Sequence, residues 1–356
     1  MSSLAKITEK SRTLLKFCAI ILAILFGIYI LFTIGGFIMN IVNPPPPIMP
    51  EQAFGELPGL KFTPPTGNIT YQINTTNGRL PILPSKMYVY RIAQPKSDLL
   101  AIQNSRIIVG NAGFTDQEIV ISENVYQWTN PNFTHNPSIQ YDTVTKNFTI
   151  QSNYLAFPNI LTNSGFPDED RIRQHVAEFL TTLKVNQTSL EFDPNIQYFT
   201  VNGPTLTPLD SIFNAKIARI NLNHKPIQNE LSKTPFPFVY PEPDISLTSL
   251  LISYPSRSRV AILQGEVYAY TILLDDFSDY PIKTAEEAFE ELKNGNGYLY
   301  NPTNKTDIQF TNVYLAYYLD KTTSEYVQPV VVFEGADVVA YISAVKYIQS
   351  AAPISE

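Results

Sequence analysis

The arrangement of hydrophobic and polar positions divides the chain into two contrasting parts. Residues 17–39 are apolar, Gly, Thr or Cys without interruption, a run of 23. A helix rises about 1.5 Å per residue, so this run spans roughly 34 Å, enough for a hydrocarbon core of about 30 Å. Beyond residue 66, short apolar segments alternate with polar ones. The pattern predicts a transmembrane anchor over residues 17–42, followed by a folded domain.

The apolar run has one alternative interpretation, a cleaved signal peptide. Such a peptide has an apolar core of about 7–15 residues and a cleavage site made of small residues. This run is longer, and Ile38-Met39-Asn40-Ile41 offers no such site. A retained helix also satisfies all its own backbone hydrogen bonds within the bilayer. We therefore expect a signal anchor that stays in the membrane.

The charges that flank the run predict its orientation. The first 16 residues hold four basic residues and one acid, Glu9, and the next basic residue is Lys61. By the positive-inside rule, residues 1–16 form a cytoplasmic tail and the rest is extracytoplasmic. Of 25 basic and 32 acidic residues, 21 and 31 remain outside, so the exterior charge is near −10. An acidic exterior argues against nucleic acid and against anionic lipid as partners.

Prolines divide the exterior part. Asn43 is followed by four prolines, and further prolines occur up to Pro65, so residues 43–65 are typical of a semi-rigid extended linker, or else of a plain loop after a helix stop. A second cluster of prolines falls within residues 232–246. We expect it to separate an N-terminal domain, residues 66–232, from a C-terminal domain, residues 246–350.

Strands dominate the predicted exterior elements. Segments rich in β-branched and aromatic residues alternate with period two, as strands with one buried face do. Pro329 lies in one of them and predicts a sheet edge or the start of a strand. The expected strands are 87–92, 119–121, 147–150, 218–222, 267–272, 313–318 and 326–333.

Three segments have the period of amphipathic helices, namely residues 97–109, 168–184 and 284–294. The last is the clearest, because Thr284 and Glu287 form a capping box and Gly295 follows the helix. Helices are fewer than strands and do not alternate with them regularly. The fold class is therefore predicted as α+β, with antiparallel sheets, a few packed helices and a single N-terminal transmembrane helix before them.

The single cysteine bears on the compartment. Cys18 lies in the apolar run, where it serves packing or is palmitoylated, so the exterior part has no disulfides. Export without disulfides favours a bacterial cell envelope. The N-x-S/T sequons are barely more numerous than chance gives in a chain so rich in Asn, Ser and Thr, and are weak signs of glycosylation; they start at Asn68, Asn74, Asn132, Asn147, Asn186 and Asn304.

The search for chemistry finds no catalytic residue and no cofactor site. The chain has no G-x-S-x-G elbow, P-loop or dinucleotide-binding G-x-G-x-x-G motif. Its three histidines, His135, His175 and His224, are isolated from each other, and His175 is expected to be solvated on its helix. Carboxylate pairs for glycan hydrolysis stay open, because such pairs are far apart in sequence.

One acidic cluster is a weak calcium candidate. Asp275, Asp276 and Asp279 lie within five residues, and calcium prefers carboxylate oxygens. The cluster lacks the spacing of an EF-hand loop. Two other acidic clusters, beginning at Asp168 and at Glu286, lie at helix starts, where acids stabilise the helix dipole.

Tyrosines occur in pairs two residues apart. Each pair shares one face of a predicted strand, either to recognise a peptide or sugar or to pack against helices. The pairs are Tyr88 and Tyr90, Tyr268 and Tyr270, and Tyr298 and Tyr300.

The last part of the chain carries a family resemblance. The helix from Ala285 to Gly295 leads into the segments 313–318, 326–335 and 339–345. This order resembles the C-terminal module of the YycH/YycI regulatory proteins and of PepSY-like extracytoplasmic domains, which also follow one N-terminal membrane helix. The resemblance implies a non-enzymatic domain that modulates a membrane partner such as a sensor kinase, or an envelope protease. It implies no catalytic residues.

The function that we expect is a membrane-anchored, extracytoplasmic binding or regulatory protein acting through protein or glycan contacts. Two alternatives stay open: an envelope enzyme such as a glycan hydrolase with dispersed carboxylates, and a structural or adhesive surface protein. A deep pocket with two facing carboxylates would favour the hydrolase.

Overall fold

The structure is a computed structural model, and it describes residues 22, 25–31, 52–65, 67–96, 98–157, 161, 165–256, 259–323 and 325–346. The chain divides into two compact units, Met1–Met49 and Pro50–Glu356. Residues 25–31 of the first unit are helical. No helix within the described ranges is long and apolar enough to cross a membrane. Residues 1–16, most of the predicted anchor 17–42 and residues 43–51 of the predicted linker lie outside those ranges.

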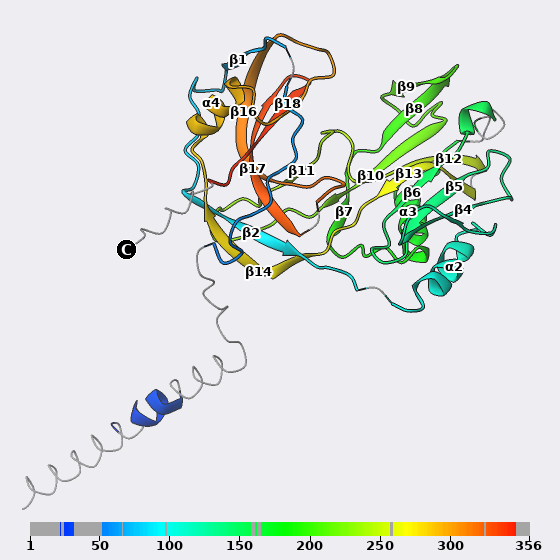
Figure 1. The fold of residues 1–356 in the computed structure, drawn as a ribbon, viewed down its shortest axis with the longest axis horizontal. Coiled ribbons are helices and arrows are strands. Elements are labelled where there is room, and N and C mark those ends of the chain that lie inside the picture. Colours follow the sequence, from blue (N-terminus) through cyan, green and yellow to red (C-terminus); the bar gives the residue numbers. More distant parts are fainter. Residues whose placement is uncertain are drawn as a thin grey trace, which may run out of the picture. The chain divides into compact units, whose positions relative to one another are not determined.

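The second unit consists of two sheets, which form two lobes (Figure 1). Antiparallel pairing dominates both sheets, and helices are few, so the predicted α+β class is confirmed. The eight-stranded sheet contains β1 (Thr70–Ile73), β2 (Lys86–Ile92), β11 (Phe238–Val239), β14 (Ile272–Pro281), β15 (Tyr298–Tyr300), β16 (Asp307–Tyr318), β17 (Tyr326–Gly335) and β18 (Val338–Ser343). The ten-stranded sheet contains β3 (Ile119–Val120), β4 (Val125–Thr129), β5 (Ser138–Asp142), β6 (Phe148–Gln151), β7 (Leu190–Phe192), β8 (Gln197–Asn202), β9 (Thr205–Leu209), β10 (Ile217–His224), β12 (Thr248–Ser256) and β13 (Arg259–Val267).

The sheets do not follow the division predicted at residues 232–246. Strands β1 and β2, from the predicted N-terminal domain, pair with β16, β14 and β17. Strands β12 and β13, from the predicted C-terminal domain, pair with β10 and β6. The prolines of residues 235–243 interrupt regular structure while the chain crosses to β11 and back. They mark a crossing between lobes, which a sequence pattern does not distinguish from a domain boundary.

Part of the predicted linker belongs to the folded unit. Leu57 is buried, and Phe62 packs edge-on against Tyr318 with ring centroids 5.2 Å apart. The backbone also contributes, because the Gln52 N–H donates to the Asp279 carbonyl at 2.9 Å. Apolar side chains between the prolines thus hold residues 52–62 against the eight-stranded lobe.

The predicted helices are present with shifted ends. The capping box of Thr284 and Glu287 opens the last helix, and Asp168 caps the one before it through the Arg171 N–H. The first helix starts later than predicted, without a side-chain cap. The helices are α2 (Ala101–Asn111), α3 (Glu169–Thr182) and α4 (Ala285–Lys293), with a short 3-10 helix, η1 (Tyr154–Ala156).

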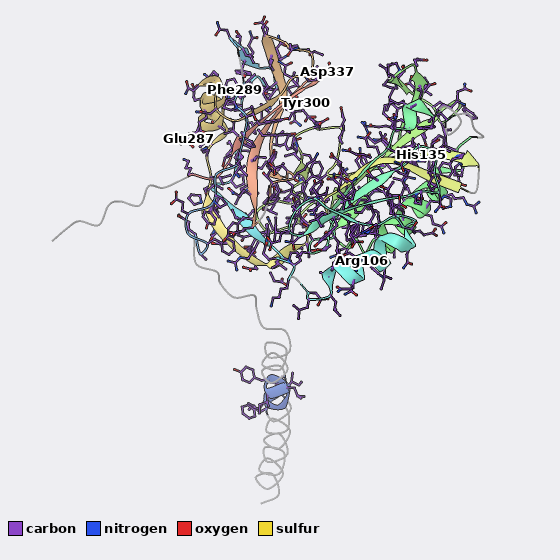
Figure 2. All side chains as sticks on the ribbon, turned by 45° about the vertical axis from the view of Figure 1, so that its right-hand side comes forward. Arg106, His135, Glu287, Phe289, Tyr300 and Asp337 are labelled. Carbon is purple, nitrogen blue, oxygen red and sulfur yellow. The ribbon has the colours of Figure 1, made fainter. Side chains whose placement is uncertain are left out.

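Each sheet has its own hydrophobic core, covered by an amphipathic helix. In the ten-stranded lobe, α3 buries Ile172, Val176 and Leu180 in a core that includes the sheet residue Ile150. In the other lobe, α4 buries Leu292 and two alanines. Burying such a side chain contributes about 1.5–3 kcal/mol. Figure 2 shows the exposed residues Glu287 on α4 and Arg106 on α2, which lie on different lobes.

Of the two positions predicted for the proline in β17, a sheet edge or the start of a strand, the sheet edge is wrong. β17 lies inside its sheet, between β16 and β18, so Pro329 marks no edge. Tyr326 and Val327 pair with β2, whereas pairing with β18 begins at Val330. Pro329 therefore falls where β17 changes neighbours, and its missing N–H leaves no ladder bond unmade.

Two glycines after α4 provide a test of the packing. Both have positive φ, but an added Cβ at Gly295 meets nothing within 4 Å, whereas at Gly297 it lies 2.5 Å from the Tyr341 carbonyl oxygen and collides with Ile342. We expect Gly295→Ala to lower the free energy of unfolding by about 1 kcal/mol, and Gly297→Ala by about 3 kcal/mol, in urea titrations. Equal losses for the two variants would contradict the close approach of β15 and β18.

Candidate functional site

The three aspartates of the calcium candidate are not brought together. Asp279 is buried and pairs with Lys86 at 2.5 Å, and Asp276 pairs with Arg91 at 3.3 Å. Asp275 is exposed, at an irregularity where β14 pairs with β2. Across the part of the chain that the structure describes, no three His, Cys, Asp or Glu side chains form a group that could hold a metal ion.

The three histidines are buried or half-buried within the fold. His135 is buried, and His175 is half-buried rather than solvated, with Nδ1 2.8 Å from the Tyr254 hydroxyl. His224, at the end of β10, lies where the two lobes meet. Nothing in the sequence around His224 distinguishes it from the other two.

The tyrosine pairs serve mainly packing. Tyr88 and Tyr90 are buried, and Tyr90 lies edge-on against Tyr317 at 5.5 Å between ring centroids. Tyr298 stacks on Tyr341 at 5.7 Å. The remaining pair, at positions 268 and 270, is different, because it lies in a connection between the lobes.

Residues 268–271 were expected within a strand over 267–272, and this prediction is wrong. β13 ends at Val267 and β14 begins at Ile272, so the four residues between them form the interlobe linker. Side chains of the ten-stranded lobe bind it in place of a sheet partner. The Ala269 N–H donates to Asn147 Oδ1 at 3.2 Å, and Ser189 Oγ donates to the Tyr270 carbonyl at 3.0 Å.

His224 also binds the interlobe linker. The Tyr270 N–H donates to His224 Nε2 at 3.3 Å, so the neutral ring carries its proton on Nδ1, which faces the Tyr240 hydroxyl at 3.4 Å. Only 2% of His224 is exposed. Burial lowers the pKa of His224 from its ordinary value of 6.5 to about 4. Protonation of Nε2 would also break the bond from the linker.

A cleft of about 810 Å³ opens beside the interlobe linker, and we call it the junction cleft. Both lobes and the β2–α2 connection line it, and its size is that of a ligand site. Its lining is Ile92, Ala93, Gln94, Pro95, Ile121, Ser122, Val125, Gln140, Asp142, Val144, Thr145, Lys146, Asn147, Phe148, Thr149, Lys184, Val185, Asn186, Tyr268, Ala269, Tyr270, Thr271, Lys321, Thr322 and Thr323.

The charges in the junction cleft are mostly positive. Lys146, Lys184 and Lys321 line it, and an adjoining cavity of about 430 Å³ shares the first two and adds Lys96 and one carboxylate, Asp98. The cleft has one carboxylate, Asp142, whose Oδ1 accepts two backbone N–H groups of its own turn at 2.8 and 3.0 Å. A positive cleft in a chain of net charge −7 attracts anions.

The three cleft lysines differ in their surroundings. Lys321 pairs with Glu266 at 2.5 Å. Lys146 is half-buried and donates to the Thr143 carbonyl at 2.5 Å, and burial lowers the pKa of its ammonium, against the opposing effect of nearby carboxylates. Lys184 is exposed and pairs with no carboxylate among the described residues. The Lys184 ammonium group could therefore bind an anion without first breaking an ion pair.

Two of these lysines stand on left-handed backbone. Lys146 has φ 66° and Lys184 has φ 60°, a conformation that costs a non-glycine residue about 1 kcal/mol. Lys184 ends α3 in a Schellman motif, with its N–H bonded to the Thr181 carbonyl and the Val185 N–H bonded to the Leu180 carbonyl. Glycine is the usual residue at this position, so the local structure does not explain the lysine.

A third cavity, of about 360 Å³, lies on another part of the junction, and we call it the acidic cavity. His224 lines it from β10, and Val339 from β18. The rest of its lining contains no lysine or arginine. It includes three carboxylates and four aromatic rings, namely Glu191, Asp244 and Glu334, and Phe238, Tyr240, Tyr314 and Tyr341.

Comparison with known proteins gives a limited result. No family model matches the chain, and no curated protein matches it. The crystal structure of an uncharacterized protein from Eubacterium rectale ATCC 33656 is similar over 75% of this chain and 80% of its own chain, with 11% identity and a TM-score of 0.35. Similarity at this level supports no inference about function.

The buried histidine predicts a pH dependence of stability. Below pH 6.5 the unfolded chain binds a proton at His224, whereas the folded chain does so only near pH 4. Stability is therefore fully present above pH 6.5 and falls as the pH falls, by about 2 kcal/mol between pH 7.5 and 5 from this group alone. His224→Gln should remove this contribution of about 2 kcal/mol to the pH dependence of stability. Urea titrations of wild type and variant at both pH values test it, and an identical pH dependence would contradict the assignment.

The Schellman motifs that end α3 and α4 make a matched pair. In α4 the left-handed position is Gly295, with the same two bonds to Leu292 and Glu291 carbonyls that Lys184 and its neighbour make in α3. We expect Lys184→Gly to raise the free energy of unfolding by about 1 kcal/mol and Gly295→Lys to lower it by about as much. If Lys184→Gly destabilises the fold, the lysine is there for stability and not for the cleft.

Proposed function

We propose that this chain is a membrane-anchored extracytoplasmic binding protein that acts through contacts at the junction cleft and not through catalysis. The observation that carries the proposal is the composition of the cleft. Lysines, amides, hydroxyls and aromatic rings surround a concave site between two lobes, which is where binding sites commonly form.

The polar groups of the cleft suit recognition better than reaction. General acid–base or nucleophilic catalysis needs at least two groups positioned against each other. The described lining includes a single carboxylate, Asp142, already bonded within its turn, and no histidine or cysteine. Such a lining can hold a ligand by hydrogen bonds and charge, and it lacks a base beside a nucleophile.

Placement outside the membrane rests on the N-terminal sequence. The apolar run 17–39, the basic residues before it and the acidic exterior together favour an N-in anchor. On this proposal residues 43–51 are the spacer, because the folded unit already includes residues 52–62.

The resemblance to the YycH/YycI proteins adds a class of partner. It concerns α4 and β16–β18, which lie together in the eight-stranded lobe. On this proposal ligand binding at the junction is relayed to a membrane protein such as a sensor kinase or to an envelope protease. The interlobe linker suits a relay, because it borders the cleft and connects both lobes.

A photo-crosslinking experiment in native envelopes tests the site. Thr145 is exposed and lines the cleft, whereas Thr234 is exposed and lies outside its lining. With a photoreactive phenylalanine at either position of the full chain, we expect one discrete adduct from Thr145 and none from Thr234. Competition by an excess of unlabelled protein should remove the adduct. Equal labelling from both positions would contradict binding at the cleft.

The acidic cavity keeps one alternative function open, a glycan hydrolase. Glu191, Asp244 and Glu334 share a lining with aromatic rings, the combination that glycosidases use. Release of reducing ends from envelope polysaccharide by the full chain, abolished by Glu334→Gln but not by Glu325→Gln, which lies outside the cavity, would establish hydrolysis and overturn the binding proposal. We expect no release of reducing ends by the wild-type chain or by either variant.

A further inference from the structure

We propose that the ligand of the junction cleft is an anionic glycan, a saccharide chain that carries carboxylate or phosphate groups. The inference rests on the proposed function and names the class of ligand for the same site. It depends on three observations, namely the local charge, the backbone under the lysines and the kind of polar group between them.

The charge of the cleft is opposite to that of the chain. Lys96, Lys146, Lys184 and Lys321 line the cleft and the cavity that joins it, while the chain as a whole carries −7. Clustering of like charge is unfavourable in the free protein unless something offsets it. Three carboxylates offset it only partly. Glu266 pairs with Lys321, Asp98 lines the adjoining cavity, and the Oδ1 of Asp142 already accepts two backbone N–H groups of its turn. An anionic ligand supplies the missing countercharge.

The backbone shows that the lysines are kept at a cost to local structure. Two of the described non-glycine residues with positive φ are Lys146 and Lys184, and both line the cleft and its adjoining cavity. At the end of α3 glycine would fit the backbone better, as Gly295 does at the end of α4. Strain of this kind is typical of functional positions, where the side chain and not the backbone is under selection.

The remaining polar groups favour a saccharide over an acidic peptide. Amides and hydroxyls alternate around the lysines, among them Gln140, Thr149 and Thr323, and the ring of Tyr268 borders them. Sugar hydroxyls pair with such groups as both donors and acceptors. Peptides are usually bound through a free sheet edge or through apolar anchor pockets. The cleft is also too large for a single small ion, so repeated anionic units fit it better.

The test measures binding to the full chain in nanodiscs of neutral lipid. Four probes are compared: oligogalacturonate for carboxylates, phosphomannan fragments for phosphates, a neutral cello-oligosaccharide, and polyglutamate as an acidic peptide. We expect at least one anionic glycan to bind, more weakly at about 200 mM than at about 50 mM salt, and the two remaining probes not to bind. The difference between oligogalacturonate and phosphomannan identifies the anionic group.

Variants assign the binding to the lysines. Lys184→Gly should weaken glycan binding about three- to tenfold without loss of stability, so unfolding cannot explain the change. Lys184→Arg should retain binding. Lys233→Gln serves as the matched control, because Lys233 is exposed and lies outside the lining of the cleft. Equal binding by wild type and Lys184→Gly would overturn the role of this lysine and with it the inference.

The outcomes separate this inference from the proposed function. If the neutral saccharide binds as tightly as the anionic ones, or if only polyglutamate binds, the anionic glycan is ruled out while the chain remains a binding protein. If an anionic glycan binds and is also hydrolysed, the inference about the ligand stands and the non-catalytic function is overturned.

Discussion

The bond from the Tyr270 N–H to His224 Nε2 holds the arrangement on which the candidate site depends. It fixes a four-residue linker that belongs to neither sheet, at the place where the chain leaves β13 for β14. Together with the bonds to Asn147 and Ser189 and the bond from the Tyr268 N–H to the Leu247 carbonyl, it ties the linker to the ten-stranded lobe. The junction cleft borders this linker, and His224 lines the acidic cavity, so both cavities owe their shape to the same few polar contacts.

Those contacts also explain why polar groups are concentrated at the junction between the two apolar cores. Each lobe buries its own apolar core, and these cores supply the bulk of stability. Between the lobes, backbone groups that have left a sheet still require partners, and side chains provide them. A junction held by directional bonds leaves space beside it, which is where a ligand can enter.

Much of the fold could be predicted from the sequence, because helices and half-buried strands carry local signals. The capping box at Thr284 and the hydrophobic period of α3 predicted the ends of α4 and α3 to within two residues. The pairing could not be predicted, since β1 and β2 find their partners 180 or more residues away. The segment 267–272 has the composition of a strand, and only its position between two sheets makes it a linker. Prolines 235–243 likewise signal an interruption without saying what the chain does next.

The candidate site was missed for a related reason. Motif searches look for histidines, cysteines and paired carboxylates, whereas this cleft is built from lysines, amides and hydroxyls of separate segments. One local signal was present. Helix α3 ends at a left-handed position that is occupied by Lys184, where glycine is the usual residue. Lys146 has the same left-handed backbone in its turn. Residues that fit their backbone poorly are the signal that sequence reasoning can use.

The pairing of the first strands with the last has a consequence for how the protein is made. β1 and β2 are synthesised early, yet their partners β14, β16 and β17 follow only after the whole ten-stranded lobe. The ten-stranded lobe can assemble from a nearly continuous stretch of chain, whereas the other must wait with unpaired strand edges exposed. Long-range pairing of this kind folds slowly. Folding of this chain therefore follows an order, in which the lobe that contains the first strands is the last to close.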